Sequence, residues 1–235
     1  MSDQREIIVE LFGAAMKYGS GPDVLRDFDL TVQAGSFLLI VGASGAGKTT
    51  LLTSIARAAA PAIGRLTLFG RDTARIDRGE RARIRRRIGL VCQDLRLLDH
   101  LSAAANLALP LRIAGLPVKQ IRPPVAELME WLGITGLAAR RPGELSAAER
   151  QLLALGRAVI GRPDLLLADE PTSLLDGPLA HRALHLLGEL NRAGTTILLA
   201  THDPALPARV RARAMRLADG RLHPAAATAS VDQFA

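Results

Sequence analysis

A glycine-rich stretch that ends in a lysine and a threonine is the clearest candidate for anion binding. Residues 42–49 read GASGAGKT and match the pattern G-x-x-x-x-G-K-[ST] at every fixed position. Glycines let the backbone curl so that successive N–H groups face one phosphate, and a helix start adds partial positive charge. Lys48 would reach the β- and γ-phosphates of a nucleotide, and the Thr49 hydroxyl would bind Mg²⁺. The residues predicted to bind nucleotide here are Gly42, Ser44, Gly45, Ala46, Gly47, Lys48, Thr49 and Thr50.

Two adjacent carboxylates, Asp169 and Glu170, follow the apolar run LLLA. Unpaired charge at the end of a buried strand is costly, so such a pair is expected to have a use. Beside a phosphate-binding loop, Asp169 would hold Mg²⁺ through water or as an outer ligand, and Glu170 would polarise the attacking water as general base. Taken alone, the pair fits a solvated strand end equally well. Together with residues 42–49, it indicates nucleotide hydrolysis.

Short apolar strands that alternate with helical segments must position these groups. This order predicts an α/β fold with a largely parallel core sheet. Between Cys92 and Ile160 the strand pattern stops, which predicts a helical insertion. Strands are predicted at 7–11, 37–41, 65–69, 88–92, 164–169 and 195–201, and helices at about 48–59, 124–132, 147–160 and 178–192.

Composition excludes several other classes of protein. The chain has 235 residues, a net charge of +7, and 49% hydrophobic residues, enough for a sizeable core. No apolar run approaches the roughly 18 residues of a membrane span, so we expect any membrane role to be peripheral. The charged N-terminus makes export unlikely. Cys92, the only cysteine, excludes an intrachain disulfide, and 3% aromatic residues argue against a stacking platform for nucleic acid.

The ordered motifs resemble those of the ATP-binding subunits of ABC transporters over about residues 6–222. Besides the phosphate-binding loop and the acidic pair, Gln93 is similar to the Q-loop glutamine. Residues 145–149, LSAAE, are similar to the signature LSGGE/Q. Residues 173–176 resemble the D-loop, and His202 resembles the switch histidine.

The resemblance implies a P-loop NTPase fold of the ABC ATPase type. Such a fold has a mostly parallel core sheet, an antiparallel β subdomain and a helical insertion. We expect the ATP-binding domain to span residues 1–222, with a helical subdomain at about 93–160. Residues 223–235 are Ala-rich and weakly patterned, and a loosely ordered tail is expected there.

The resemblance also implies roles in binding ATP. Two copies would form an ATP-dependent homodimer, head to tail, with each ATP between the loop of one copy and the signature of the other. Ser146, Ala147 and Ala148 would then meet the γ-phosphate across the interface. Tyr18 lies where the family places an aromatic ring against adenine.

Further roles implied by the resemblance concern catalysis. Gln93 would contact Mg²⁺ and the attacking water, and His202 would hold the γ-phosphate and orient Glu170. With Glu170, they are the predicted catalytic residues. Thr49, Gln93 and Asp169 are the predicted metal ligands.

The signature departs from the family pattern. Ala147 and Ala148 stand where the family has two glycines, and Leu152 stands where it usually has arginine. Glycine permits close approach to phosphate, whereas alanine favours the helix start. The sequence does not decide which of these two effects is larger in this chain. We expect retained ATP binding with weak or partner-dependent hydrolysis.

Within the family, the chain is most similar to the cell-division ATPases, and it shares several stretches with lipoprotein-release and macrolide-export ATPases. This similarity implies an integral membrane partner at the division septum, docked near residues 93–111, and possible contacts with other division proteins. ATP-driven changes would then control cell-wall hydrolysis. The alternatives are a nucleotide-gated scaffold with little hydrolysis and an exporter ATPase.

The basic clusters at 81–87 and 209–216 suggest proximity to anionic headgroups on the cytoplasmic face of the inner membrane. No nucleic acid partner is expected.

Overall fold

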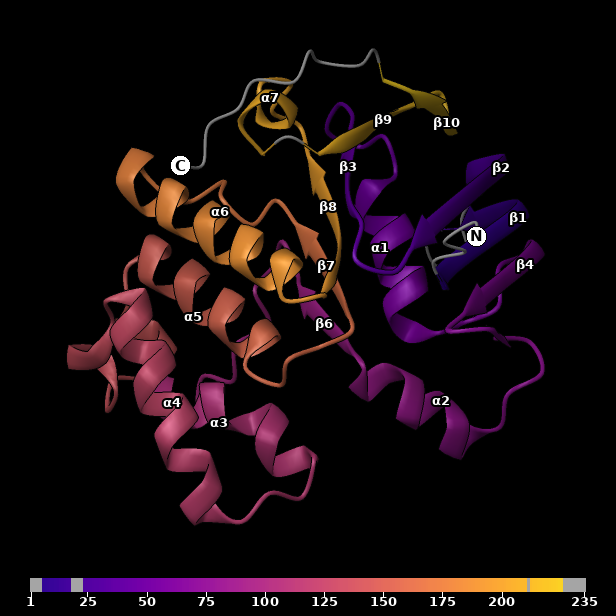
Figure 1. Ribbon diagram of the computed structural model, residues 1–235. Coiled ribbons are helices and arrows are strands. Elements are labelled where there is room, and N and C mark those ends of the chain that lie inside the picture. The colour runs from indigo at the N-terminus through magenta and orange to yellow at the C-terminus, as the bar shows by residue number, and fades with distance from the viewer. Residues whose placement is uncertain (1–5, 18–22, 211, 226–235) are drawn as a thin grey trace.

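The computed structural model describes residues 6–17, 23–210 and 212–225, and two β-sheets organise this part of the chain (Figure 1). The larger sheet has the strand order β10-β9-β3-β8-β7-β6. Neighbours from β9 to β6 are parallel, and β10 is antiparallel to β9. Its strands are β3 (Phe37–Val41), β6 (Ile88–Val91), β7 (Leu165–Asp169), β8 (Thr196–Thr201), β9 (Arg213–Ala218) and β10 (Arg221–Pro224). The predicted α/β class with a mostly parallel core sheet is confirmed.

The smaller sheet is antiparallel, with the order β2-β1-β4-β5. Its strands are β1 (Ile7–Lys17), β2 (Asp23–Gln33), β4 (Ile63–Leu68) and β5 (Arg71–Asp72). Strand β2 was not predicted from the sequence. Asp27 has a φ of 44° inside β2, and the buried positions step from Leu25 to Phe28 before alternating. This irregularity breaks the period of two by which strands are recognised.

Helices fill the space between the sheets and cover the outer face of the larger one (Figure 1). The α-helices are α1 (Lys48–Arg57), α2 (Arg78–Arg86), α3 (Ala103–Ile113), α4 (Val118–Leu132), α5 (Ala147–Val159), α6 (Gly177–Arg192) and α7 (Leu206–Val210). Two 3₁₀ turns, η1 (Thr135–Leu137) and η2 (Pro142–Glu144), connect α4 to α5. The predicted helical insertion therefore runs through α3, α4 and α5, between β6 and β7.

The larger sheet divides the hydrophobic core in two. Leu166 and Ala168 of β7 pack in the cluster that contains α3 to α6. Leu165 and Leu167, the alternate residues, pack in the cluster that contains α1 and the antiparallel sheet. A strand buried on both faces reads as a continuous apolar run, which is why β7 and β8 were recognisable in the sequence.

Helix α4 begins earlier than predicted. We expected it to start near Pro124, yet it begins at Val118 and contains both Pro123 and Pro124. Prolines remove backbone hydrogen bonds inside a helix. Ile121, with Val125 and later apolar residues one helical turn apart, is buried against the core, and this packing holds the helix through the prolines.

Several short elements were not predicted from the sequence, namely β5, α2, α3, α7, β9 and β10. Helix α2, capped by the Asp77 side chain, occupies the first basic cluster. Strands β9 and β10 form a hairpin at the edge of the larger sheet. Strand β10 extends to Pro224, two residues into the segment where we expected a loose tail; residues 226–235 lie outside the described part of the chain.

No helix in the described part of the chain is both long and apolar enough to span a membrane.

Candidate nucleotide-binding site

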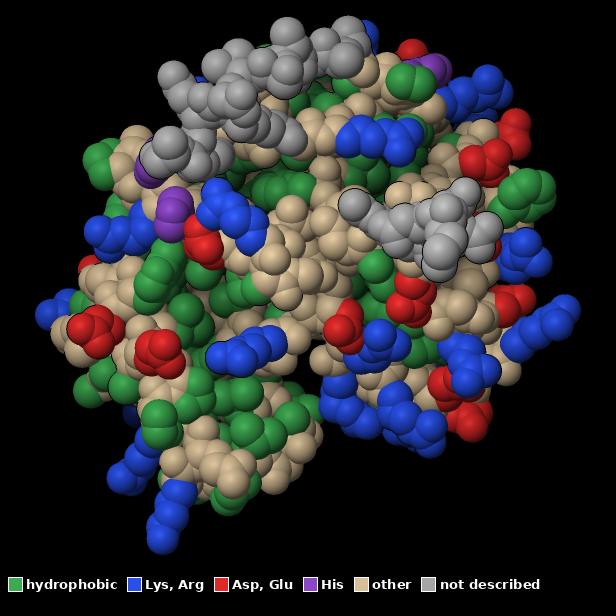
Figure 2. Space-filling view, in the orientation of Figure 1, with side chains coloured by type: hydrophobic (Ala, Val, Ile, Leu, Met, Phe, Trp, Pro, Cys, Tyr) green, Lys and Arg blue, Asp and Glu red, His purple; other side chains and the backbone are tan. Residues whose placement is uncertain are grey.

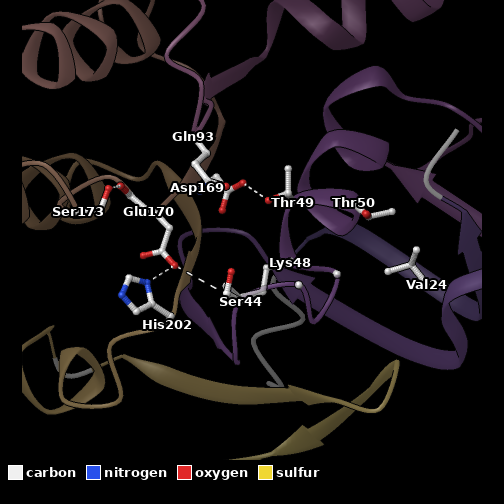
Figure 3. A pocket seen from close by; sticks show the side chains of 12 residues that line it. Val24, Ser44, Lys48, Thr49, Thr50, Gln93, Asp169, Glu170, Ser173 and His202 are labelled. Carbon is white, nitrogen blue, oxygen red and sulfur yellow. Dashed lines mark hydrogen bonds and ion pairs between the residues drawn. The ribbon is translucent and has the colours of Figure 1, made fainter. Parts of the chain in front are cut away.

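A cavity of about 550 Å³ lies where α1 begins, beside the ends of β7 and β8 (Figure 3). Ligands of open α/β sheets bind at the carboxyl ends of the strands. Of the predicted site residues, the cavity is lined by Ser44, Gly45, Gly47, Lys48, Thr49, Thr50, Gln93, Asp169, Glu170 and His202. Val24 of β2 and Ser173 also line it.

The loop before α1 has the backbone of an anion site. Gly45 and Gly47 have φ values of 79° and 104°, which residues with a Cβ rarely adopt. A Cβ on Gly47 would also lie 2.8 Å from Val24 Cγ1. The first hydrogen bond after this turn runs from Leu51 N to Gly47 O, at 3.0 Å. The N–H groups at the helix start therefore have no partner within the helix and are oriented for an anion.

Lys48 is 7% exposed and points into the same loop. Its Nζ donates to the carbonyl oxygens of Gly42 (2.8 Å) and Ala43 (3.0 Å) and lies 3.9 Å from Glu170 Oε1. The ammonium group is thus held at the cavity by neutral acceptors and one nearby carboxylate. Such a group provides a point charge for a phosphate.

Thr49 and Asp169, 120 positions apart in sequence, meet across the cavity. The Thr49 hydroxyl donates to Asp169 Oδ2 at 2.6 Å. Burial raises the pKa of Asp169 above its usual value, and the hydrogen bond from Thr49 opposes this rise. A hydroxyl and a carboxylate are oxygen ligands of the kind Mg²⁺ prefers, so this pair fits the predicted metal.

Glu170 is constrained in both its backbone and its side chain. Its φ of 50° is unusual for a non-glycine residue. Oε1 lies 2.8 Å from His202 Nδ1, and Oε2 accepts a hydrogen bond from the Thr201 hydroxyl at 3.1 Å. Ser173 Oγ donates to the Glu170 carbonyl oxygen at 3.0 Å. Side chains on both sides of the carboxylate therefore fix its direction toward the cavity (Figure 3).

Two residues that hold Glu170 were missed by the sequence analysis. Thr201 was predicted only as the last residue of the strand at 195–201, and Gln151 was not considered. Gln151, on α5, is 2% exposed and donates to Pro171 O at 2.9 Å, beside Glu170. A buried amide on an otherwise apolar helix face needs a partner, and this was the available signal.

The signature residues lie at the start of α5 and do not line the cavity of their own chain. Ser146 caps α5: its Oγ accepts from Glu149 N at 3.2 Å, and Glu149 Oε2 accepts from Ser146 N at 2.7 Å. The hydrogen bonds from Ser146 lower the pKa of Glu149. Ala147 and Ala148 are helical, and neither has a positive φ. The local backbone here does not require glycine.

Three further residues were predicted for the site. Two of them belong to the phosphate-binding loop, and the third lies outside the described part of the chain. Gly42 and Ala46 belong to the loop without lining the cavity. A Cβ on Gly42 would lie 2.6 Å from Leu217 O, so the close approach of β9 requires glycine. Tyr18 lies outside the described part of the chain.

A phosphate-binding loop between β3 and α1, with carboxylates at the end of β7, defines a P-loop NTPase. The sequence profile described as "ABC transporter" matches residues 25–173. The chain belongs to the ATP-binding proteins of this family.

Several curated relatives have similar identity to the chain. The cell division ATP-binding protein FtsE of Escherichia coli is 39% identical over 206 residues, covering 88% of this chain and 93% of FtsE. The macrolide export ATP-binding/permease protein MacB of Paracoccus denitrificans is 36% identical, covering 94% of this chain and 34% of MacB. The methionine import ATP-binding protein MetN of Cereibacter sphaeroides is 42% identical, covering 80% of this chain and 54% of MetN. The chain thus spans about a third of the length of MacB.

Solved structures agree with the family. A dimeric post-hydrolysis state of the ATP-binding cassette MJ0796, bound to ADP and Pi, superposes with a TM-score of 0.85 at 31% identity. The alignment covers 92% of this chain and 96% of that chain. The ABC ATPase fold is therefore shown by sequence and structure together.

Proposed function

We propose that this chain binds and hydrolyses ATP with Mg²⁺ and thereby drives an integral membrane partner of the FtsX type in cell division. One observation carries the ATPase part: Lys48, the Thr49–Asp169 pair and the Glu170–His202 pair converge on one cavity. We further propose that residues 1–222 form the ATP-binding domain, with its helical subdomain at 93–160.

In this mechanism, the N–H groups at the start of α1 and Lys48 bind the β- and γ-phosphates. Thr49 and Asp169, with Gln93, would hold Mg²⁺. When bound, Mg²⁺ neutralises negative charge on the phosphates. Lys48 exchanges its two carbonyl acceptors for phosphate oxygens, which carry full negative charge.

Hydrolysis then depends on the carboxylate that His202 and Thr201 orient. Glu170 accepts a proton from the attacking water as the water oxygen bonds to the γ-phosphorus and the bond to ADP breaks. His202 keeps Glu170 in position and contacts the γ-phosphate.

A second copy completes the site in this proposal. Ser146 of that copy, whose Oγ accepts the capping bond, still has its O–H to donate to the γ-phosphate. The N–H groups of Ala147 and Ala148 at the helix start add positive charge there. The dimeric state of the solved cassette supports this arrangement.

The catalytic role is tested by Glu170→Gln, with Glu130→Gln on α4 as the matched control. We expect Glu170→Gln to retain ATP binding and to slow phosphate release by about 10²–10⁴-fold, the usual contribution of a general base. Steady-state phosphate release measures the rate, and light scattering with ATP measures dimerisation. Equal rates for the parent and Glu170→Gln would contradict the proposal and support the scaffold alternative, which Ala147 and Ala148 favour.

The cell-division part rests on the FtsE similarity, whereas the MacB similarity favours an exporter ATPase. We propose a peripheral location on the cytoplasmic face of the inner membrane, at the septum. A groove of about 900 Å³ between α2 and α3, lined by both apolar residues and arginines, is the surface that we propose for the partner. Arg85, Arg86 and Ile113 are among its lining residues.

Affinity purification of the tagged chain from detergent-solubilised membranes tests this part. We expect an FtsX-like subunit to co-purify together with other division proteins, and depletion of the chain to cause filamentous cells. Normal division with co-purification of an exporter permease would refute the cell-division role and leave the ATPase proposal intact.

A further inference from the structure

The segment that follows Gln93 has an unusual backbone. Leu95 and Arg96 have φ values of 55° and 46° in succession. Residues other than glycine rarely adopt this conformation and keep it only when their surroundings impose it. Gln93 itself is exposed and lines the nucleotide cavity. Its position therefore depends on what holds Leu95 and Arg96, two and three positions further along the chain.

Arg157, on α5, provides that support. Its Nη2 donates to Leu95 O at 2.7 Å, and its Nη1 donates to Arg96 O at 2.7 Å. The planar guanidinium, with its donors in a fixed fork, matches two adjacent carbonyl oxygens in a way that a lysine ammonium cannot. Arg157 thus binds the carbonyl oxygens of both left-handed residues, while their backbone N–H groups donate locally to Cys92 O and Asp94 O.

Asn106, on α3, extends this support. It is fully buried, and its Oδ1 accepts a hydrogen bond from Leu98 N at 2.9 Å. Its Nδ2 donates to Leu98 O at 3.1 Å, and Arg157 Nη1 lies 3.4 Å from its Oδ1. The segment 95–98 is therefore tied to both α3 and α5.

The charge of Arg157 is poorly explained by stability alone. Burial lowers its pKa, and within the described residues its partners are carbonyl and amide oxygens, with no carboxylate. Desolvating a cation against neutral acceptors is an inefficient way to stabilise a fold. An apolar side chain would pack at lower cost but would leave the two carbonyl oxygens without donors.

Helix α5 begins at the signature and carries two side chains that bind backbone beside active-site residues. Ser146 begins the helix, Gln151 holds the turn at Glu170, and Arg157 holds the segment after Gln93. One rigid element thus links the signature, the general base and Gln93.

We propose that Arg157, supported by Asn106, is a positioning residue that holds Gln93 at the nucleotide cavity. The inference rests on the proposed ATPase function, because Gln93 acts there on Mg²⁺ and the attacking water. Arg157 touches neither ATP nor water in this role.

A double-mutant cycle with Arg157→Lys and Gln93→Ala tests the inference. Lysine keeps the charge and loses the fork. We expect Arg157→Lys to lower kcat by about 10–100-fold, the cost of misplacing a catalytic group by about 1 Å, with KM for ATP nearly unchanged. The double variant should be no slower than Gln93→Ala, because Arg157 acts through Gln93. The proposal would be overturned if the loss of kcat in the double variant were the product of the losses in the two single variants. A change confined to KM in Arg157→Lys would overturn it as well.

Arg182→Lys is the matched control, because Arg182 also donates to a backbone carbonyl, Leu132 O, at 3.3 Å and lies outside the site. It should leave kcat unchanged.

Amide hydrogen exchange distinguishes failure of this inference from failure of the ATPase proposal, because it needs no turnover. Protection of Leu98 N, bonded to Asn106, should fall in Arg157→Lys and not in Arg182→Lys. Unchanged protection in Arg157→Lys would reject the positioning role even in a protein that hydrolyses no ATP.

Discussion

Asp169 is buried in the site, and this burial disfavours the charged form of its carboxyl group. It is 3% exposed, and burial raises its pKa despite the hydrogen bond from Thr49. A carboxyl whose pKa is raised on folding binds protons more tightly in the folded state than in the unfolded state. The free energy of unfolding therefore falls as pH rises from the ordinary aspartate pKa to the raised pKa of the folded protein.

Replacing this carboxylate should stabilise the protein while it removes a metal ligand. In the absence of nucleotide at pH 7.5, we expect Asp169→Asn to raise the free energy of unfolding by roughly 0.5–2 kcal/mol, the common gain from one stabilising substitution. The gain should shrink at acid pH, where the parent carboxyl is protonated. Urea unfolding between pH 4 and 8 measures it.

Asp99→Asn, an exposed carboxylate outside the site, serves as the control for Asp169→Asn. A lower stability of Asp169→Asn at pH 7.5, or a gain that is independent of pH, would contradict this account of the buried charge.

At the scale of elements, α5 decides what the unusual signature means. Ala147 and Ala148 occupy the first turn of an ordinary right-handed helix, capped by Ser146 and Glu149. The concern that the signature needs glycine dihedrals therefore does not apply to this backbone. The added methyl groups remain relevant to a second copy facing the helix.

The double substitution Ala147→Gly/Ala148→Gly separates these effects. Each glycine should lower the free energy of unfolding by roughly 0.5–1 kcal/mol through backbone entropy. If the methyl groups crowd the γ-phosphate, the double-glycine form should release phosphate faster than the parent in the absence of the membrane partner. Thermal unfolding and steady-state phosphate release measure the two effects.

Ala104→Gly/Ala105→Gly, in the first turn of α3, controls for helix destabilisation alone. Equal turnover of the parent and the double-glycine form would show that the alanines do not weaken hydrolysis.

At the scale of the whole molecule, the positive charge gathers over particular elements. Figure 2 shows Lys and Arg side chains concentrated around α2. Within the basic cluster at 81–87, Arg87 pairs with Asp164, and Arg81 donates to Thr73 O. The exposed Arg83, Arg85 and Arg86 therefore provide the free surface charge expected to approach anionic headgroups.

We expect the chain to co-sediment with vesicles of mixed neutral and anionic lipid at low salt and to be released at high salt. Each arginine near an anionic surface contributes about 1 kcal/mol. Changing Arg83, Arg85 and Arg86 to Glu should abolish binding at an ionic strength of about 0.1 M, where the Debye length is about 10 Å.

The same charge change at exposed arginines of the β-sheets, namely Arg26→Glu, Arg65→Glu and Arg221→Glu, is the control. Equal loss in both triple variants would mean that net charge alone, and not the α2 surface, governs binding.

The sequence by itself determined the phosphate-binding loop, the carboxylates after β7 and the parallel core. These features are local: a contiguous motif specifies its backbone, and a strand buried on both faces is a contiguous apolar run. The strands β2, β9 and β10 and the full length of α4 were not predictable in this way. The backbone irregularity in β2, the position of β9 and β10 at a sheet edge and the two prolines in α4 each obscure the residue pattern by which such elements are recognised. Tertiary packing stabilises each of these elements.

Only the tertiary structure decided which distant side chains meet. Thr49 reaches Asp169, Thr201 and His202 reach Glu170, and Arg157 reaches the segment after Gln93. These pairs are joined through the register of β3, β7 and β8 and the packing of α5, which no local pattern encodes. The sequence motifs therefore specify which chemical groups the site contains. The orientation of these groups and their electrostatic environment arise from contacts between elements far apart in the chain.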